Sequence, residues 1–153
     1  MQLAAKKLFL LDLDGTVYLE DSLLPGAAEF LEWTRQRGYQ VRYLTNNSSR
    51  GVEGYIEKMA RMGIATTRED YLTSVDATVR YLQKEQPGKR CYVFGTDSFD
   101  RQLEEAGLPV TRDREDGAEL LLCGFDTELT FQKLEDACIL LNRGWWPRNP
   151  HPG

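Results

Sequence analysis

The sequence predicts an α/β fold, in which short apolar strands alternate with amphipathic helices around a parallel sheet. Three observations carry this prediction. An apolar run at residues 8–11 ends on two aspartates, other short apolar runs follow, and apolar residues recur at helical spacing between them. Glycine and proline separate the segments. Because parallel strands are buried on both faces, we expect residues 8–11 to lie in the hydrophobic interior.

The first half of the chain follows this alternation. A helix is predicted to open at Pro25 and to end at Gly38, because proline suits a first helical turn and glycine a helix end. Residues 41–44 predict the second strand, and the helix after it is expected to stop at Gly63. The apolar face of that helix is predicted to hold Val52, Tyr55, Ile56 and Met59.

The second half predicts further helices and strands on both sides of a break at 86–88, Gln-Pro-Gly. Residues 91–94 and 119–123 are the expected strands, with a helix at 99–106 between them. Two more helices are predicted from their apolar faces, one with Val75, Val79 and Leu82 and one with Phe131, Leu134, Cys138 and Leu141. We place domain boundaries at the break, giving segments 1–86 and 87–144 and an irregular tail at 145–153 that is rich in proline.

The two aspartates at the end of the first strand are the main candidate site. Alternate side chains of a strand share a face, so Asp12 and Asp14 are expected to project together, roughly 7 Å apart along the strand. Such a pair can bind a hard cation, can divide the roles of nucleophile and proton shuttle, or can simply end a strand in water. The EF-hand alternative is rejected because it would place Leu10 at the first ligand position.

Residues 12–16, Asp-Leu-Asp-Gly-Thr, resemble the nucleophile motif of the haloacid dehalogenase superfamily of phosphohydrolases. Val17-Tyr18 and the Pro-Gly-Ala of 25–27 are similar to the branch that contains 4-nitrophenylphosphatases and NagD-type phosphatases. Residues 41–49 resemble that branch's phosphate-binding strand, and 92–96 and 124–130 resemble segments of its α/β cap. The resemblance implies a Rossmann-like parallel core at 1–86 and part of a cap at 87–144.

The resemblance also implies a chemistry, the hydrolysis of small phosphorylated metabolites through an aspartyl-phosphate. Asp12 would attack phosphorus, and Asp14 would protonate the departing alcohol and then activate water. Mg²⁺ would bind the Asp12 carboxylate and the backbone carbonyl of Asp14. The Thr45 hydroxyl and the Asn46 amide would hold the phosphoryl oxygens. An alternative reading of 45–47 is a polar turn that caps the next helix.

Two elements of the family's machinery do not occur in the 153 residues. One is a lysine within Gly-Lys-Pro after the cap, and the other is a late Gly-Asp motif that completes the metal site. The sequence also stops within the expected cap, so we expect a truncated or frame-shifted product. A catalytically impaired remnant and a self-associating phosphate-binding module, for example a homo-oligomer, are therefore the alternative functions.

Composition and charge exclude other classes of partner. The net charge is −5 and no basic stripe occurs, so we expect no nucleic-acid partner. No apolar run approaches membrane length, and the run at 8–11 is too short for a signal peptide. Cys91, Cys123 and Cys138 lack the Cys-x-x-Cys spacing of metal sites. They are expected to be buried or half-buried free thiols in a reducing cytoplasm.

Overall fold

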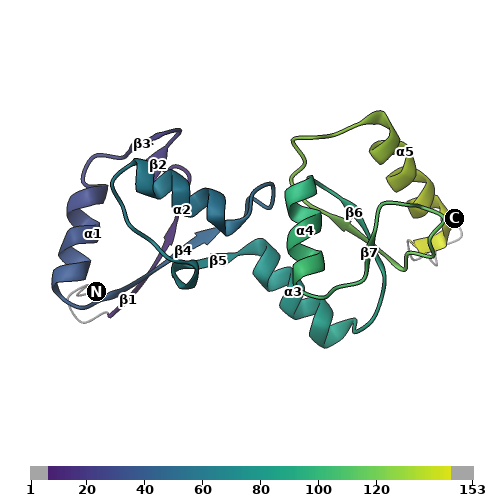
Figure 1. The fold of residues 1–153 in the computed structure, drawn as a ribbon, viewed down its shortest axis with the longest axis horizontal. Coiled ribbons are helices and arrows are strands. Elements are labelled where there is room, and N and C mark those ends of the chain that lie inside the picture. The colour runs from purple at the N-terminus through teal and green to yellow at the C-terminus, as the bar shows by residue number, and fades with distance from the viewer. Residues whose placement is uncertain (1–6, 146–153) are drawn as a thin grey trace, which may run out of the picture. The chain divides into compact units, whose positions relative to one another are not determined.

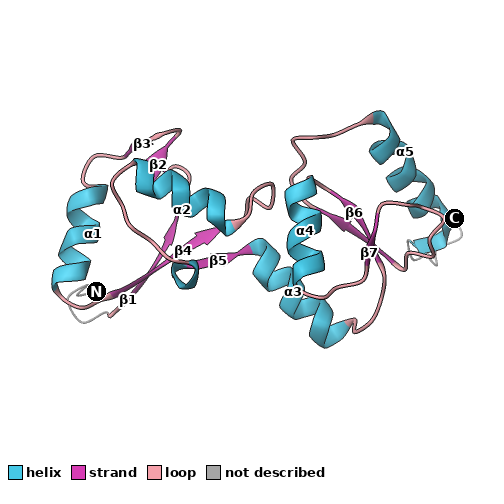
Figure 2. Ribbon diagram, in the orientation of Figure 1, coloured by secondary structure: helices cyan, strands magenta, loops and turns pink. Residues whose placement is uncertain are grey.

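The computed structural model describes residues 7–145, which fold as two compact units (Figure 1). The first unit takes the chain up to Asn46 together with Arg50–Ser74. The second unit holds Asn47–Ser49 and the chain from Val75 onward. Each unit combines strands and helices (Figure 2), which confirms the predicted α/β class. The predicted boundary between segments 1–86 and 87–144 separates a core from a cap, whereas the two units are defined by their compactness. The predicted division therefore stays a prediction.

The first unit is built on a three-stranded parallel sheet in the order β1-β4-β5. Asp12 at the end of β1 lies in register with Leu44, and Thr45 at the end of β4 lies in register with Thr73 of β5. The strands therefore end at one common edge. Their bounds are β1 (Leu8–Asp12), β4 (Gln40–Thr45) and β5 (Tyr71–Thr73), and the connecting helices are α1 (Ala27–Gln36) and α2 (Val52–Arg61).

Both helices cover the same face of this sheet. Leu31 of α1 and the apolar residues of α2 form one buried cluster with Tyr43 and Tyr71 of the strands. Phe9 adds an aromatic group beside α1, with its ring 5.4 Å from that of Phe30. The predicted face of α2 is thus correct for its four residues, which are buried or packed against the cluster.

The opposite face of the sheet is exposed, which corrects the expectation that residues 8–11 are buried. Leu8 and Leu10 are 49% and 59% exposed, and Leu72 of β5 is 42% exposed. Of residues 8–11, only Phe9 and Leu11 face the helices. The physical reason is that a strand buries a side chain only where another layer covers it, and the described residues cover one face.

Three short elements of the first unit carry no periodic signal in the sequence. β2 and β3 form an antiparallel hairpin directly after the aspartates, with Tyr18 paired to Leu23. A 3₁₀ turn precedes β5, and it is fixed by a reciprocal capping box between Thr67 and Asp70. The bounds are β2 (Tyr18–Leu19), β3 (Ser22–Leu23) and η2 (Arg68–Asp70).

The second unit contains another three-stranded parallel sheet, in the order β7-β6-β8. Its core gathers Val75 of α3, Val93 of β6, and Phe99 and Leu103 of α4. Gly95 is required beside this core, because a Cβ there would lie 2.6 Å from the Phe99 ring. The bounds are α3 (Ser74–Glu85), β6 (Cys91–Phe94), α4 (Asp97–Glu105), β7 (Val110–Thr111), β8 (Leu120–Cys123), α5 (Phe131–Leu140) and the π-helical turn η3 (Leu141–Trp145).

The last helix, α5, forms as predicted but buries a different face. The expected apolar face is exposed, with Phe131 at 80%, Leu134 at 46% and Leu141 at 42%. Ala137 and Leu140 are buried instead, together with Asp136. Burial of that carboxylate is possible because Arg114 Nη1 donates to it at 2.8 Å and Gln132 Nε2 at 2.9 Å.

Tyr92 contributes a predicted loss of stability at alkaline pH. Burial, and then the neighbouring Asp136 carboxylate, raises the pKa of Tyr92 to about 12. The folded state therefore holds a proton that the unfolded state releases near pH ~10, so stability present below pH ~10 is lost as pH rises towards the folded pKa. Urea unfolding should show a smaller loss between pH 8 and 11 in Tyr92→Phe than in the wild type. Equal losses in both proteins would contradict this assignment.

All three cysteines are free in the described residues, and only Cys91 is buried, so the expectation of burial is wrong for Cys123 and Cys138. Burial raises the pKa of the Cys91 thiol. No helix in residues 7–145 combines the length and the apolar composition that a membrane span requires. Residues 146–153 of the predicted tail lie outside the described residues.

Candidate active site

The carboxyl end of β1 presents two exposed aspartates on either side of a buried leucine. Asp12 and Asp14 are exposed, whereas Leu13 is 0% exposed and belongs to the core cluster of the first unit. Strand β1 ends at Asp12, so Asp14 lies in the turn that follows, and the shared projection of the two carboxylates stays a prediction. Leu13 therefore anchors the segment, and both carboxylates stay accessible from solvent.

A tight turn follows the aspartates and is organised by the backbone carbonyl of Leu13. That carbonyl accepts the N–H groups of Thr16, Val17 and Tyr18 at 3.2, 2.9 and 3.3 Å. The Gly15 N–H donates back to the carbonyl of Tyr18 at 2.8 Å. Gly15 has φ +80°, a conformation that glycine adopts without a steric penalty. The turn thus fixes the backbone on both sides of Asp14.

Thr45 lies at the same sheet edge, on the strand next to β1. Asp12 is in register with Leu44, so Thr45 is one residue further along the neighbouring strand. The Thr45 side chain is buried, and its hydroxyl donates to the Tyr55 hydroxyl of α2 at 3.3 Å. The topology therefore brings Asp12 and Thr45 to adjacent strand ends.

Asn46 follows as an exposed residue whose carbonyl accepts the Ser74 hydroxyl at 3.1 Å. Beyond it, the Asn47 side-chain oxygen accepts the N–H and the hydroxyl of Ser49 at 2.9 and 2.7 Å. The N-cap of α2 is Gly51, and no side chain caps that helix. The alternative reading of 45–47 as the cap of α2 is therefore wrong, although 47–49 do form a polar turn.

Burial raises the pKa values of two tyrosines, Tyr18 and Tyr55, and the Asp14 carboxylate helps to raise both. Burial, and then the Asp14 carboxylate, raises the pKa of Tyr18 far above its usual value. Burial also raises the pKa of Tyr55, with a contribution from Asp14, while Arg50 acts in the opposite direction. Tyr18 is 0% exposed, and its hydroxyl has no hydrogen-bond partner among the described residues. Both phenols are therefore protonated at neutral pH.

The donor set suits a hard cation but offers few charged ligands. Asp12 and Asp14 provide accessible carboxylate oxygens, which Mg²⁺ prefers. No group of three or more His, Cys, Asp or Glu side chains in residues 7–145 is arranged to hold a metal ion. The two aspartates fit Mg²⁺ as partial ligands whose remaining positions would be taken by backbone carbonyls, water or substrate oxygens.

Lys133 and Asp126 have a structural role in the second unit. Lys133 Nζ lies 3.2 Å from Asp126 and donates to the backbone carbonyls of Gly95 and Glu128 at 2.8 and 3.0 Å. The two side chains are only 14% and 4% exposed. The pair joins the loop after β6 to the loop after β8, so these residues hold the fold of the second unit together.

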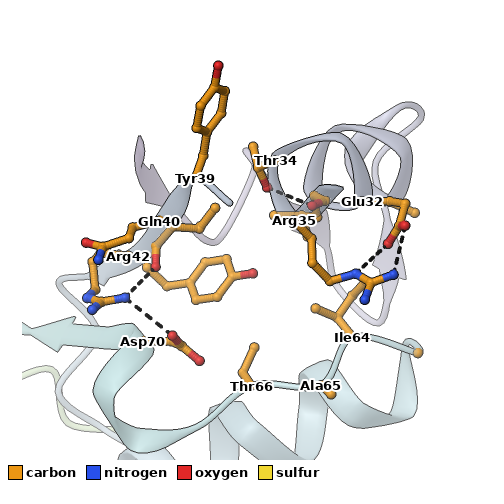
Figure 3. A pocket seen from close by; sticks show the side chains of 15 residues that line it. Glu32, Thr34, Arg35, Tyr39, Gln40, Arg42, Ile64, Ala65, Thr66 and Asp70 are labelled. Atoms are coloured by element: carbon orange, nitrogen blue, oxygen red, sulfur yellow. Dashed lines mark hydrogen bonds and ion pairs between the residues drawn. The ribbon is translucent and has the colours of Figure 1, made fainter. Parts of the chain in front are cut away.

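A groove in the first unit runs beside α1 and the first four residues of β4. It has a volume of about 640 Å³ and is bounded by α1, the start of β4 and residues 63–66 (Figure 3). Its two arginines are paired within the wall, Arg35 with Glu32 at 2.8 Å and Arg42 with Asp70 at 3.5 Å. Neither aspartate, nor Thr45 nor Asn46, lines this groove, so it is distinct from the aspartate edge.

The sequence model of the haloacid dehalogenase-like hydrolase family matches residues 9–109 of this chain. These residues include both aspartates, Thr45 and Asn46. The chain belongs to the haloacid dehalogenase-like hydrolase family. The predicted resemblance of residues 12–16 to the nucleophile motif of this family is thereby confirmed at the level of the family. The individual roles of the four site residues remain predictions.

Similar proteins place the chain in the predicted branch of the haloacid dehalogenase-like hydrolases. The acid sugar phosphatase of Staphylococcus aureus is 33% identical over 138 residues, which are 90% of this chain and 52% of that protein. The 4-nitrophenylphosphatase of Thermotoga maritima has a TM-score of 0.82 and 37% identity over 91% of this chain and 52% of its own. The chain thus spans about half the length of these relatives.

A third haloacid dehalogenase-like relative was solved with a metal ion. The glycerol phosphate phosphatase of Mycobacterium tuberculosis, in complex with magnesium, has a TM-score of 0.83 and 26% identity. This chain is covered to 92% and the phosphatase to 43%.

Sequence reasoning missed Tyr55 and Tyr18 as neighbours of the site. Helical spacing predicts Tyr55 as a core residue of α2, which is correct, but it does not predict that the Tyr55 hydroxyl contacts Thr45. A usable signal is that most buried tyrosine hydroxyls pair with a polar group, and Thr45 at a strand end is a suitable one.

Proposed function

We propose that the chain binds and hydrolyses phosphate monoesters of small metabolites, with Asp12 as the nucleophile. The observation that carries this proposal is the register of β1 and β4, which sets Asp12 beside Leu44 and next to Thr45. Asp12 and Thr45 therefore lie at adjacent strand ends on the carboxyl edge of a parallel sheet, where open α/β folds bind their ligands.

The proposed reaction has two steps at phosphorus. In the first, an Asp12 carboxylate oxygen attacks, the bond from phosphorus to the ester oxygen breaks, and protonated Asp14 gives its proton to the departing alcohol. In the second, Asp14 takes a proton from water, which attacks the aspartyl-phosphate and releases inorganic phosphate. Thr45 and the Asn46 N–H hold the phosphoryl oxygens in both steps.

Asp12 and the Asp14 carbonyl are the proposed Mg²⁺ ligands. Mg²⁺ would neutralise charge on the nucleophile and the phosphate when bound. Because the Asp12 side chain is exposed and the turn fixes the backbone around Asp14, a solvated cation could reach both groups without opening the core. The sequence contains no Gly-Lys-Pro motif, so we expect slow turnover by this chain.

The proposal is tested with 4-nitrophenyl phosphate in Mg²⁺ and after metal removal with EDTA. We expect release of 4-nitrophenol to need the metal and to return when Mg²⁺ is added in excess. 4-Nitrophenyl acetate is the matched control, because it has the same leaving group without the phosphate. Hydrolysis of both esters at rates independent of Mg²⁺ would contradict the proposed phosphatase.

A self-associating phosphate-binding module is the second candidate function. The exposed leucines on β1 and β5 favour it, because apolar side chains on an open sheet face promote association. Sedimentation velocity at several concentrations, with and without inorganic phosphate, separates the two readings. A monomer at all concentrations would count against the module.

A further inference from the structure

The hydroxyl that is proposed to bind phosphate has a buried partner. Thr45 Oγ1 lies 3.3 Å from the Tyr55 hydroxyl, and the two residues are 6% and 3% exposed. Tyr55 belongs to α2 and Thr45 to the end of β4, so the contact joins a helix to the candidate site. Its position within the core means that neither hydroxyl can freely exchange this partner for bulk water.

Which of the two hydroxyls donates in this contact depends on whether phosphate is bound. Each hydroxyl has one proton to donate and can also accept a hydrogen bond. In the ligand-free structure Thr45 donates to Tyr55. When Thr45 donates to a phosphoryl oxygen instead, its own oxygen can accept from Tyr55. The contact then persists with donor and acceptor exchanged.

We propose that Tyr55 is a positioning residue that turns the Thr45 hydroxyl towards bound phosphate. This inference rests on the proposed function and adds a residue that touches no substrate. By donating to Thr45, the phenol favours the rotamer in which the threonine proton faces the anion. When Thr45 turns, it gives up Tyr55 as its acceptor, and Tyr55 then becomes the donor to the Thr45 oxygen.

The surroundings of Tyr55 suit this role. Its ring stacks on that of Tyr71 at a centroid distance of 6.1 Å, and Val52 and Met59 of the same helix are buried beside it in one cluster. A packed ring holds its hydroxyl in one place, so little entropy is lost when phosphate binds. Burial raises the pKa of the phenol, which keeps its proton available at neutral pH.

The test compares Tyr55→Phe with Tyr71→Phe in the full chain. Tyr71 is a matched control, because it is buried in the same cluster but its hydroxyl pairs with Thr66 at 2.8 Å. Titration calorimetry with inorganic phosphate in Mg²⁺ measures affinity. We expect Tyr55→Phe to weaken binding about three- to tenfold, the effect of one lost hydrogen bond. Tyr71→Phe should bind as the wild type does.

A double-mutant cycle with Thr45→Val separates positioning from general damage. Once the threonine hydroxyl is absent, Tyr55→Phe should cause no further loss of phosphate affinity. Additive losses, or equal losses in the two tyrosine variants, would overturn the positioning role. A wild-type chain that binds no phosphate would instead overturn the proposed function, and the inference with it.

A measurement on the unmodified sequence covers the case in which Tyr55→Phe does not fold. With tyrosine labelled by ¹³C at Cζ, phosphate should shift the Tyr55 signal, because the phenol changes from acceptor to donor. The Tyr71 signal should stay in place. Phosphate binding without a Tyr55 shift would overturn the inference.

Discussion

Replacing Asp12 with asparagine is expected to abolish magnesium-dependent hydrolysis of 4-nitrophenyl phosphate, a loss of at least about 10³-fold. Asparagine has nearly the same shape but is a poor nucleophile, so the substitution removes the atom that attacks phosphorus. Asp12 is exposed, so its replacement should leave the fold intact. Initial rates measured by absorbance, together with circular dichroism of both proteins, check this prediction.

The Asp14→Asn variant is the informative companion to Asp12→Asn. 4-Nitrophenolate leaves without a proton, so loss of the acid should spare the first step for this ester. The second step needs Asp14 to activate water, and the aspartyl-phosphate should therefore accumulate. A burst of 4-nitrophenol equal to the protein concentration, and a phosphorylated peptide that contains Asp12, are the expected signatures.

Other outcomes would assign the chemistry differently. Full activity in Asp12→Asn would exclude Asp12 as the nucleophile, whatever Asp14 does. A burst that survives in Asp12→Asn would place the covalent intermediate on another residue. If the wild type is as slow as Asp12→Asn while both bind phosphate, the phosphate-binding alternative is favoured over hydrolysis.

The sequence was sufficient to predict the elements that carry a repeating pattern. Helical spacing of apolar residues predicted α2 and its buried face, because a helix that packs against a sheet requires one apolar stripe. The short apolar run before Asp12 predicted β1, and both carboxylates that follow it are exposed. The same pattern predicts that polar residues following parallel strands lie at one sheet edge, which Asp12 and Thr45 do, while their roles stay predictions.

The errors concern burial, which depends on what covers a residue rather than on the residue itself. Leu10 and Phe131 are as apolar as Leu13, but no described layer covers them. On α5 the buried face instead includes Asp136, which ion pairing makes tolerable, and no periodicity reports such a partner. The sequence did not predict the contact between Thr45 and Tyr55 for a related reason. The contact joins the hydroxyls of two different elements, and no periodic pattern reports it.

The second large effect is expected from Leu13→Ala, which should lower the free energy of unfolding by about 2–5 kcal/mol. Leu13 is 0% exposed and lies in the core cluster of the first unit, so truncation leaves a cavity in packed surroundings. Such a loss is a large part of the roughly 5–15 kcal/mol that stabilises a typical domain. Urea unfolding followed by circular dichroism measures it.

Leu10→Ala is the matched control for Leu13→Ala, because it removes the same atoms from the adjoining strand β1. Leu10 is 59% exposed, so its truncation should change stability by no more than about 0.5 kcal/mol. The contrast reports which residues of this segment point into the core, and thereby which way Asp12 and Asp14 point. Similar losses from both variants would mean that the two leucines are equally buried. The aspartates would then lack the shared accessible side on which the proposed phosphate chemistry depends.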